Sequence, residues 1–187
     1  MKKILLIAVS ALLAVSAYAQ PKFAHVNSQE LLQLCPEADD ARATMTASSQ
    51  AAQETLQAMI EEYQTKYQQY EQKAATWTTS IRESKEKELV DFQQRIQEFD
   101  QSVNAELQQQ QQALWAPIYE KVNNTIQTLA KEGGYIYVFD ASSVLYLDAT
   151  QSVDLTPAAR KALNIADGRT LETLQAELAA QQQAQAQ

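Results

Sequence analysis

The side chains of this 187-residue sequence that first suggest catalysis or metal binding lie within its first 40 positions. His25 is the only histidine and Cys35 the only cysteine, so a Cys/His pair of nucleophile and base could only be these two residues. Such a pair also needs a third group that orients the base. His25 lies inside a segment typical of a β-strand, where a structural role suits it better. We therefore expect no catalytic residue and no enzyme.

An acidic cluster near the start of a long helical segment is the one place that could bind a cation. Asp39 and Asp40 follow closely after Glu37. Carboxylates in the first turn of a helix are stabilised by its dipole, and this role is enough to explain them. The sequence has neither the Cys/His spacing of a metal site nor a glycine-rich phosphate-binding loop. We expect no metal and no other cofactor.

The single cysteine excludes a disulfide within one chain. A bridge between two chains remains possible. We favour the simpler interpretation, in which Cys35 is a small apolar side chain at a helix end, reduced and mostly buried.

The N-terminus has the pattern of a secretory signal peptide. Lys2 and Lys3 precede an apolar run over residues 4–15, and residues 17–19 are small enough for cleavage between Ala19 and Gln20. We expect residues 1–19 to be removed, with a retained anchor as the alternative. No later apolar run approaches the length of about 20 residues that spans a bilayer, so we expect no stable membrane insertion.

The charge of the chain limits its partners. Fifteen basic and 23 acidic residues give a net charge of −8. Removal of the signal takes away two lysines, which leaves 13 basic residues and a net charge near −10. An acidic surface argues against nucleic acid and anionic lipid as partners.

The main element is a helical pattern over residues 36–132, which contains no glycine. Apolar residues recur at steps of three and four, and the stripe they form is narrow, as in a coiled coil. Residues 76–80 interrupt the pattern, and Ser80 and Glu83 have the spacing of a capping box. We favour a hairpin with its tip there over one continuous helix of about 140 Å, because folding back buries both stripes. The stripe is weak near the base of the hairpin, where alanines dominate.

Short elements flank this arm. Residues 20–35 should form a strand and a short helix, and residues 133–165 a β hairpin, with strands at 135–139 and 144–147, followed by a helix. Residues 166–187 form a Gln/Ala-rich tail that is weakly helical, to about Ala180, or disordered. The expected fold class is α+β, with a long antiparallel helical hairpin on a small β body. Three short strands expose hydrophobic edges, which favours oligomerisation.

The sequences at both ends of the arm carry a resemblance to a known family. Residues 23–32, FAHVNSQELL, with Pro36-Glu37 after them, are similar to the opening strand and short helix of the OmpH/Skp family of periplasmic chaperones. Residues 137–146, YVFDASSVLY, resemble its closing strands, and Asp154-Leu155-Thr156 with the helix that follows resembles its last element. The resemblance covers residues 22–165. Its best-studied members are basic, whereas this chain is acidic.

This resemblance implies a homotrimer with a β-barrel body and three helical arms around a cavity. It also implies a periplasmic, ATP-independent holdase that binds unfolded outer-membrane proteins and prevents their aggregation. A structural coiled-coil spacer or adaptor of the cell envelope is the alternative.

Contact with such clients would need apolar side chains outside the seam of the arm. Tyr63, Tyr67 and Tyr70 fit the seam itself. The candidates for client contact are Ile60, Trp77, Ile81 and Val90. Trp77 is expected at the tip, with little to pack against inside one hairpin, and exposed aromatic surface suits promiscuous binding.

Overall fold

A computed structural model describes residues 21–185, which divide into two compact units. The first unit contains residues 21–31 and 122–168, and the second contains residues 32–121 and those from Arg169 onward. The expected signal peptide, with its cleavage site between Ala19 and Gln20, lies outside the described residues. Among the described residues, no helix has the length and apolar character that a membrane crossing requires.

A three-stranded sheet forms the centre of the first unit. Its order is β2–β1–β3, so that β1 (Lys22–Val26) lies between β2 (Tyr135–Asp140) and β3 (Ser152–Asp154). Both pairings are parallel. Parallel neighbours need a long crossover connection, and here the whole helical hairpin separates β1 from β2. One strand thus precedes the hairpin and two follow it, as the sequence predicts.

The predicted β hairpin over residues 135–139 and 144–147 is wrong. β2 pairs with β1 and not with the segment that follows it, and residues 144–147 form no strand. Asp140 ends β2 in a tight turn, because its Oδ1 accepts hydrogen bonds from the amide and the hydroxyl of Ser142. The third strand forms later, at Ser152–Asp154. Local β propensity therefore did not decide the pairing here.

Helix α5 (Thr156–Ala162) and the start of α2 (Ser28–Leu34) complete the first unit. Its buried apolar core is small and draws on most of its elements. The core residues are Ala24, Val26, Leu31, Val122, Leu155, Ala159, Leu163 and Ile165.

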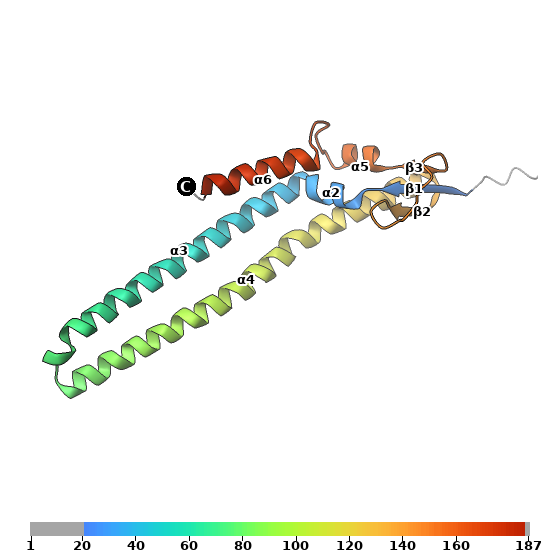
Figure 1. The fold of residues 1–187 in the computed structure, drawn as a ribbon. Coiled ribbons are helices and arrows are strands. Elements are labelled where there is room, and N and C mark those ends of the chain that lie inside the picture. The colour runs from blue at the N-terminus through green and yellow to red at the C-terminus, as the bar shows by residue number, and fades with distance from the viewer. Residues whose placement is uncertain (1–20, 186–187) are drawn as a thin grey trace, which may run out of the picture. The chain divides into compact units, whose positions relative to one another are not determined.

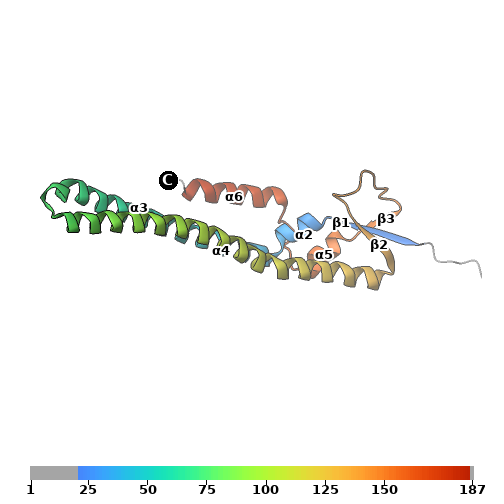
Figure 2. The same cartoon turned by 90° about the horizontal axis from the view of Figure 1, so that it is seen from below.

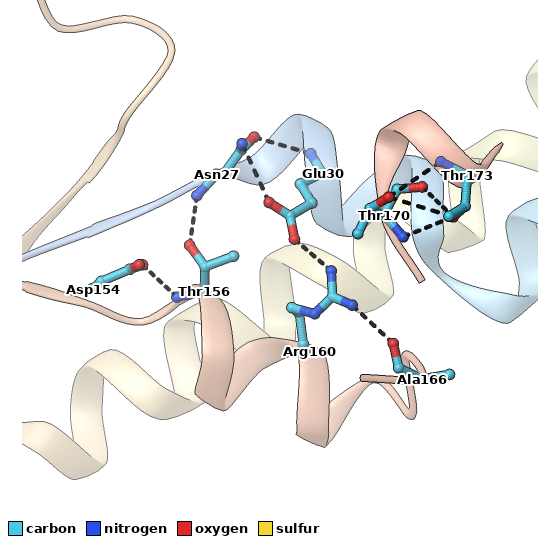
Figure 3. Close-up of polar contacts among 8 residues, drawn as sticks. All are labelled: Asn27, Glu30, Asp154, Thr156, Arg160, Ala166, Thr170 and Thr173. Carbon is cyan, nitrogen blue, oxygen red and sulfur yellow. Dashed lines mark hydrogen bonds and ion pairs between the residues drawn. The ribbon is translucent and has the colours of Figure 1, made fainter. Parts of the chain in front are cut away.

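Polar contacts join β1, α2 and α5 (Figure 3). Asn27 caps α2, because its Oδ1 accepts a hydrogen bond from the amide of Glu30 at 3.0 Å. The amide of Asn27 donates to the hydroxyl of Thr156, also at 3.0 Å. Arg160 of α5 forms an ion pair with Glu30 and donates to the carbonyl of Ala166 at 2.9 Å. The bonds from Asn27 to Thr156 and from Arg160 to Glu30 connect segments that are far apart in the sequence.

The second unit is built on a helical hairpin (Figure 1). Helix α3 (Pro36–Lys73) and helix α4 (Thr79–Gly133) run antiparallel and side by side in both views. The short 3-10 helix η1 (Ala74–Thr76) turns the chain at the tip. Pro36 occupies the first turn of α3, where the missing amide proton costs nothing. The predicted α+β class, with a long helical hairpin and a small sheet, is confirmed, and a single continuous helix is excluded.

The cap of α4 lies two residues earlier than predicted. The hydroxyl of Thr78 accepts a hydrogen bond from the amide of Ile81 at 3.4 Å, whereas Ser80 already lies inside the helix. Trp77 is extended, with ψ at 152°, and so separates the two helices. Threonine caps a helix nearly as well as serine, so residue type alone does not decide between Thr78 and Ser80.

The tail forms helix α6 (Leu171–Gln185) in the second unit, which begins next to the start of α3 and diverges from it towards the C-terminus (Figures 1 and 2). At its start, the amide of Thr173 donates to the hydroxyl of Thr170 at 3.1 Å. The helix continues beyond Ala180, where we expected helical character to end, because alanine and glutamine both favour helix.

Candidate functional site

The seam between α3 and α4 is held by aromatic contacts. Phe92 is 3% exposed, and its ring lies 6.3 Å from that of Tyr63 on the facing helix. The guanidinium carbon of Arg95 lies 4.5 Å from the centre of the Phe92 ring, and the ammonium of Lys66 lies at 5.9 Å. Both geometries are those of cation–π contacts. Phe92 therefore anchors the distal half of the arm.

The three tyrosines predicted in the seam differ in their exposure. Tyr63 and Tyr70 are half-buried there. Tyr67 stacks on Tyr63 with 6.3 Å between ring centroids, yet it is 44% exposed. Tyr67 therefore presents much of its ring to solvent and joins the possible contact surface.

Trp77 packs on its own hairpin, contrary to expectation. Its ring meets that of Tyr70 edge-on at 6.0 Å, and the side chain is half-buried. The Tyr70 hydroxyl donates to Glu86 at 2.5 Å, and this bond raises the pKa of Tyr70. A cleft of about 250 Å³ lies beside this pair and is lined in part by Lys73 and Lys85.

The other candidates for client contact divide into two kinds. Ile60 on α3 is half-buried. Ile81 and Val90 on α4 are 46% and 62% exposed, so their apolar side chains face solvent as predicted. The fold does not test whether Ile60, Ile81 and Val90 bind clients, so this role stays a prediction.

In the distal arm, the carboxylate of Glu88 binds two lysine side chains. Glu88 of α4 accepts a hydrogen bond from Lys66 of α3 at 2.8 Å and one from Lys85 of its own helix at 2.7 Å. These hydrogen bonds to two ammonium groups lower the pKa of Glu88 from 4.5 to about 2. The Lys66 contact spans the hairpin, so it ties α3 to α4 electrostatically.

A second charged group lies at the base of the arm. Cys35 is fully buried, as predicted, and its thiol donates to Glu37 at 2.7 Å. Burial, with the bond to Glu37 next, raises the pKa of Cys35 to about 11. Lys121 of α4 also pairs with Glu37, and the bonds from Cys35 and Lys121 lower the pKa of Glu37 to about 2. A thiol in such surroundings is a poor nucleophile.

The arm base carries an aromatic pair that our sequence reasoning missed. Trp115 and Tyr119 of α4 lie 6.3 Å apart, and Tyr119 is 51% exposed. Each directly follows a seam residue, as Val90 follows Leu89, so the criterion that selected Val90 would also have selected these two.

Trp115 also lines a cleft of about 720 Å³ between α3, α4 and α6. Met45 of α3 and Leu174 and Leu178 of α6 contribute apolar side chains to it. Leu174 is 4% exposed, which shows that α6 is docked through this side chain.

The acidic cluster makes ion pairs within the chain. Oδ1 of Asp39 lies 2.5 Å from Nη2 of Arg42 and 2.5 Å from Nη2 of Arg169. Two guanidinium groups thus satisfy the carboxylate that seemed best placed for a cation. Within residues 21–185, no cluster of three or more potential metal ligands is found.

His25 takes part in a contact between strands. Its Nδ1 lies 3.0 Å from the hydroxyl of Ser152, and its Nε2 lies 4.0 Å from Asp154. In a catalytic triad the serine faces Nε2 and the acid binds Nδ1, so this order is reversed, and 4.0 Å exceeds hydrogen-bond length. The parallel register of β1 and β3, which places His25 opposite Asp154, accounts for this arrangement.

The sheet of the first unit exposes a large apolar surface. Within residues 21–185, both outer strands, β2 and β3, have an edge without a partner strand. The exposed apolar residues of this surface and of the loop between β2 and β3 are Ile136, Tyr137, Phe139, Leu145, Tyr146 and Val153. An exposed sheet with open edges is a site for association with another chain.

Comparisons with known proteins agree on one family. The family model described as outer membrane protein (OmpH-like) matches residues 22–163. The chaperone protein Skp of Yersinia enterocolitica is 27% identical over 142 residues, which cover 75% of this chain and 87% of that protein. A crystal structure from Caulobacter crescentus, described as an OmpH-like outer membrane chaperone, has a TM-score of 0.68 at 18% identity, covering 78% of this chain and 85% of that one. Most of the chain thus matches the family, and the protein belongs to the OmpH-like family of outer membrane proteins.

Proposed function

We propose that this protein is a periplasmic, ATP-independent holdase that binds unfolded outer-membrane proteins and prevents their aggregation. The observation that carries the proposal is the set of apolar side chains that the arm leaves open to solvent. Tyr67, Ile81, Val90 and Tyr119 are between 44% and 62% exposed, although Tyr67 also stacks on the seam residue Tyr63. The name of the Yersinia relative supports chaperone activity, and the description of the matching family as OmpH-like outer membrane proteins supports the choice of clients.

The dispersed arrangement of these residues fits a partner without fixed structure. They are spread over both halves of the arm, so they offer many weak contacts in place of one deep pocket. Scattered apolar and aromatic surface of this kind can bind segments of varied sequence. Because the sequence has no phosphate-binding loop, capture and release would be passive.

The functional form would be a homotrimer with three arms around a cavity. The open edges of β2 and β3 and the exposed Tyr137 and Phe139 support association through the sheet. A monomer would leave this apolar surface in water, at a cost of roughly 25 cal/mol per Å². Closure of the sheets of several chains removes both edges at once.

The acidic charge of the chain shapes the mode of binding. At about −10 per mature chain, a trimer would carry about −30, and exposed charges more than about 8 Å apart are largely screened at physiological salt. Electrostatic attraction would therefore help only basic client segments. Apolar contact should provide most of the affinity, and binding should survive an increase in salt.

Light scattering from an outer-membrane β-barrel protein diluted out of urea tests the proposal. The purified chain should suppress the rise in scattering at both low and high salt. The double variant Ile81→Ser/Val90→Ser should suppress it less, while its mass in solution stays unchanged. Gln93→Ser, at an exposed polar position of the same helix, is the matched control.

Two results would contradict the proposal. A wild-type chain that leaves aggregation unchanged is no holdase, and a fixed structural spacer would behave in this way. Suppression that disappears at high salt would show that charge, and not apolar contact, carries the binding.

A further inference from the structure

Helix α6 lies outside the region that matches the family, yet it is docked on the arm. The family match ends at residue 163, whereas α6 spans Leu171–Gln185. The docking contacts are concentrated at its start, where Arg169 pairs with Asp39 and Leu174 is buried. The tail thus lies beyond the family match and contacts the arm through these two residues.

The surface of the arm that α6 faces across the cleft of about 720 Å³ carries apolar side chains among polar ones, as the proposed client-binding surface does. Met45 of α3 and Trp115 of α4 line the cleft together with Leu174 and Leu178 of α6. Trp115 is half of the aromatic pair whose other member, Tyr119, is 51% exposed. Apolar side chains of α6 thus line one side of a cleft in which an apolar client segment would fit.

The docking is shallow, so it can be reversed. Leu174 is the one buried side chain among those described in α6, and Leu171 and Leu178 are only half-buried. Beyond Leu178 the helix is rich in glutamine. Its Gln182 lines a second cleft, of about 590 Å³, together with Gln53 of α3, so the two helices pack loosely there.

We propose that α6 is a tethered competitor, which occupies the apolar arm base and is displaced when an unfolded client binds there. This inference rests on the proposed function and adds a regulatory element to it. Because the competitor is part of the chain, its local concentration is fixed. A client that meets a molecule with α6 docked must displace α6 from the arm before it can bind there. The apparent affinity for clients is then reduced in proportion to the fraction of molecules in which α6 is docked.

Substitution of Leu174 in the full-length chain separates docking from folding. Leu174→Ser removes the buried apolar contact, which should weaken docking by on the order of tenfold to a hundredfold. Arg169→Gln acts on the ion pair with Asp39 instead and should have a smaller effect in the same direction. Gln175→Ser, at an exposed position of α6, is the matched control.

The first measurement needs no client. In a Trp77→Phe background, Trp115 is the only tryptophan of the chain, and its quenching by acrylamide reports whether the cleft is covered. Leu174→Ser should increase this quenching, while the control should match the parent. Equal quenching in all variants would overturn the inference, because α6 would then not cover Trp115 in solution.

The second measurement is the binding of a fluorescein-labelled outer-membrane β-barrel protein, unfolded in urea and diluted into each variant. We expect the half-saturation concentration to fall by on the order of threefold to tenfold in Leu174→Ser and to stay unchanged in Gln175→Ser. Unchanged or weaker binding by Leu174→Ser would overturn the competition while leaving the holdase proposal intact. A failure of every variant, wild type included, to bind the probe would instead contradict the proposed function, and the competition with it.

Discussion

Alanine substitutions of Phe92 and Val90 should distinguish the residues that stabilise the arm from those that bind clients. Phe92 is 3% exposed at the seam, whereas Val90, two residues earlier on α4, is 62% exposed. The two positions share one helix and one stretch of the arm, so each serves as the control for the other. Phe92→Ala should unfold the arm more easily, and Val90→Ala should not.

The expected size of the effect follows from what the Phe92 ring touches. A buried phenylalanine replaced by alanine costs about 3–5 kcal/mol in protein cores. Only two helices surround this ring, and water can enter part of the space it leaves, so we expect about 3 kcal/mol, near the lower end. For a chain of this length that corresponds to a fall in Tm of about 6–12 °C. Val90→Ala should change stability by less than about 0.5 kcal/mol.

Circular dichroism at 222 nm, followed against temperature and urea, measures the stability of both variants, and light scattering measures their holdase activity. Val90→Ala should retain the wild-type unfolding midpoint but suppress client aggregation less well. If both variants unfolded at the same midpoint, Phe92 would not hold the seam in solution, and the cross-hairpin contact with Tyr63 would lose its assigned role.

Three further outcomes are expected. Sedimentation at micromolar concentration should give three times the mature mass, and a stable monomer would contradict the trimer. Cys35 should react slowly with a thiol reagent in the native chain and completely in urea, since it is fully buried with its pKa raised to about 11; rapid native labelling would count against burial. The lowered pKa of Glu88 stabilises the folded arm above its ordinary value of 4.5, and this contribution is lost as the pH falls towards about 2. The unfolding midpoint of Glu88→Gln should thus depend less on pH between 5 and 3 than that of wild type, and equal dependence would exclude this ion pair as an acid-sensitive element.

The sequence was most informative where one local rule acts alone. The long periodic pattern, the absence of glycine, and the break near residues 76–80 were enough to predict the two helices and their fold-back. The exposure of Ile81 and Val90 followed from the same periodicity, because both positions lie off the apolar stripe. The ends of the helices were predicted less accurately, because α4 is capped by Thr78 and not by Ser80.

The sequence was least informative where distant segments choose their partners. The run at residues 144–147 has strong β propensity, but β1 pairs with β2 on one side and β3 on the other, so this run is left in a loop. The docking of α6 depends on Leu174 reaching the arm base and on Arg169 reaching Asp39. The spacing of Leu171, Leu174 and Leu178 indicates an apolar helix face, but it does not say which surface that face meets. Tertiary partners decide both outcomes.

The arm combines firm contacts at both ends with a weak middle. In α3 the only buried residues are Ala38 and Ala41, both near its start, and the next firm cross-hairpin contacts are those of Tyr63 and Lys66 with α4. Between them, small side chains such as Ala51 leave a cleft of about 320 Å³ between the helices.

A helix pair with so little buried area in its middle can bend there without breaking the contacts that fix its ends. A rigid spacer would gain nothing from such a gap, because a rod needs uniform packing along its length. A holdase that encloses clients of different sizes needs arms that can move. The alanine- and glutamine-rich stretch that weakens the seam is therefore consistent with the proposed capture of unfolded proteins, and it explains in physical terms why the chain tolerates a poor coiled coil in its largest element.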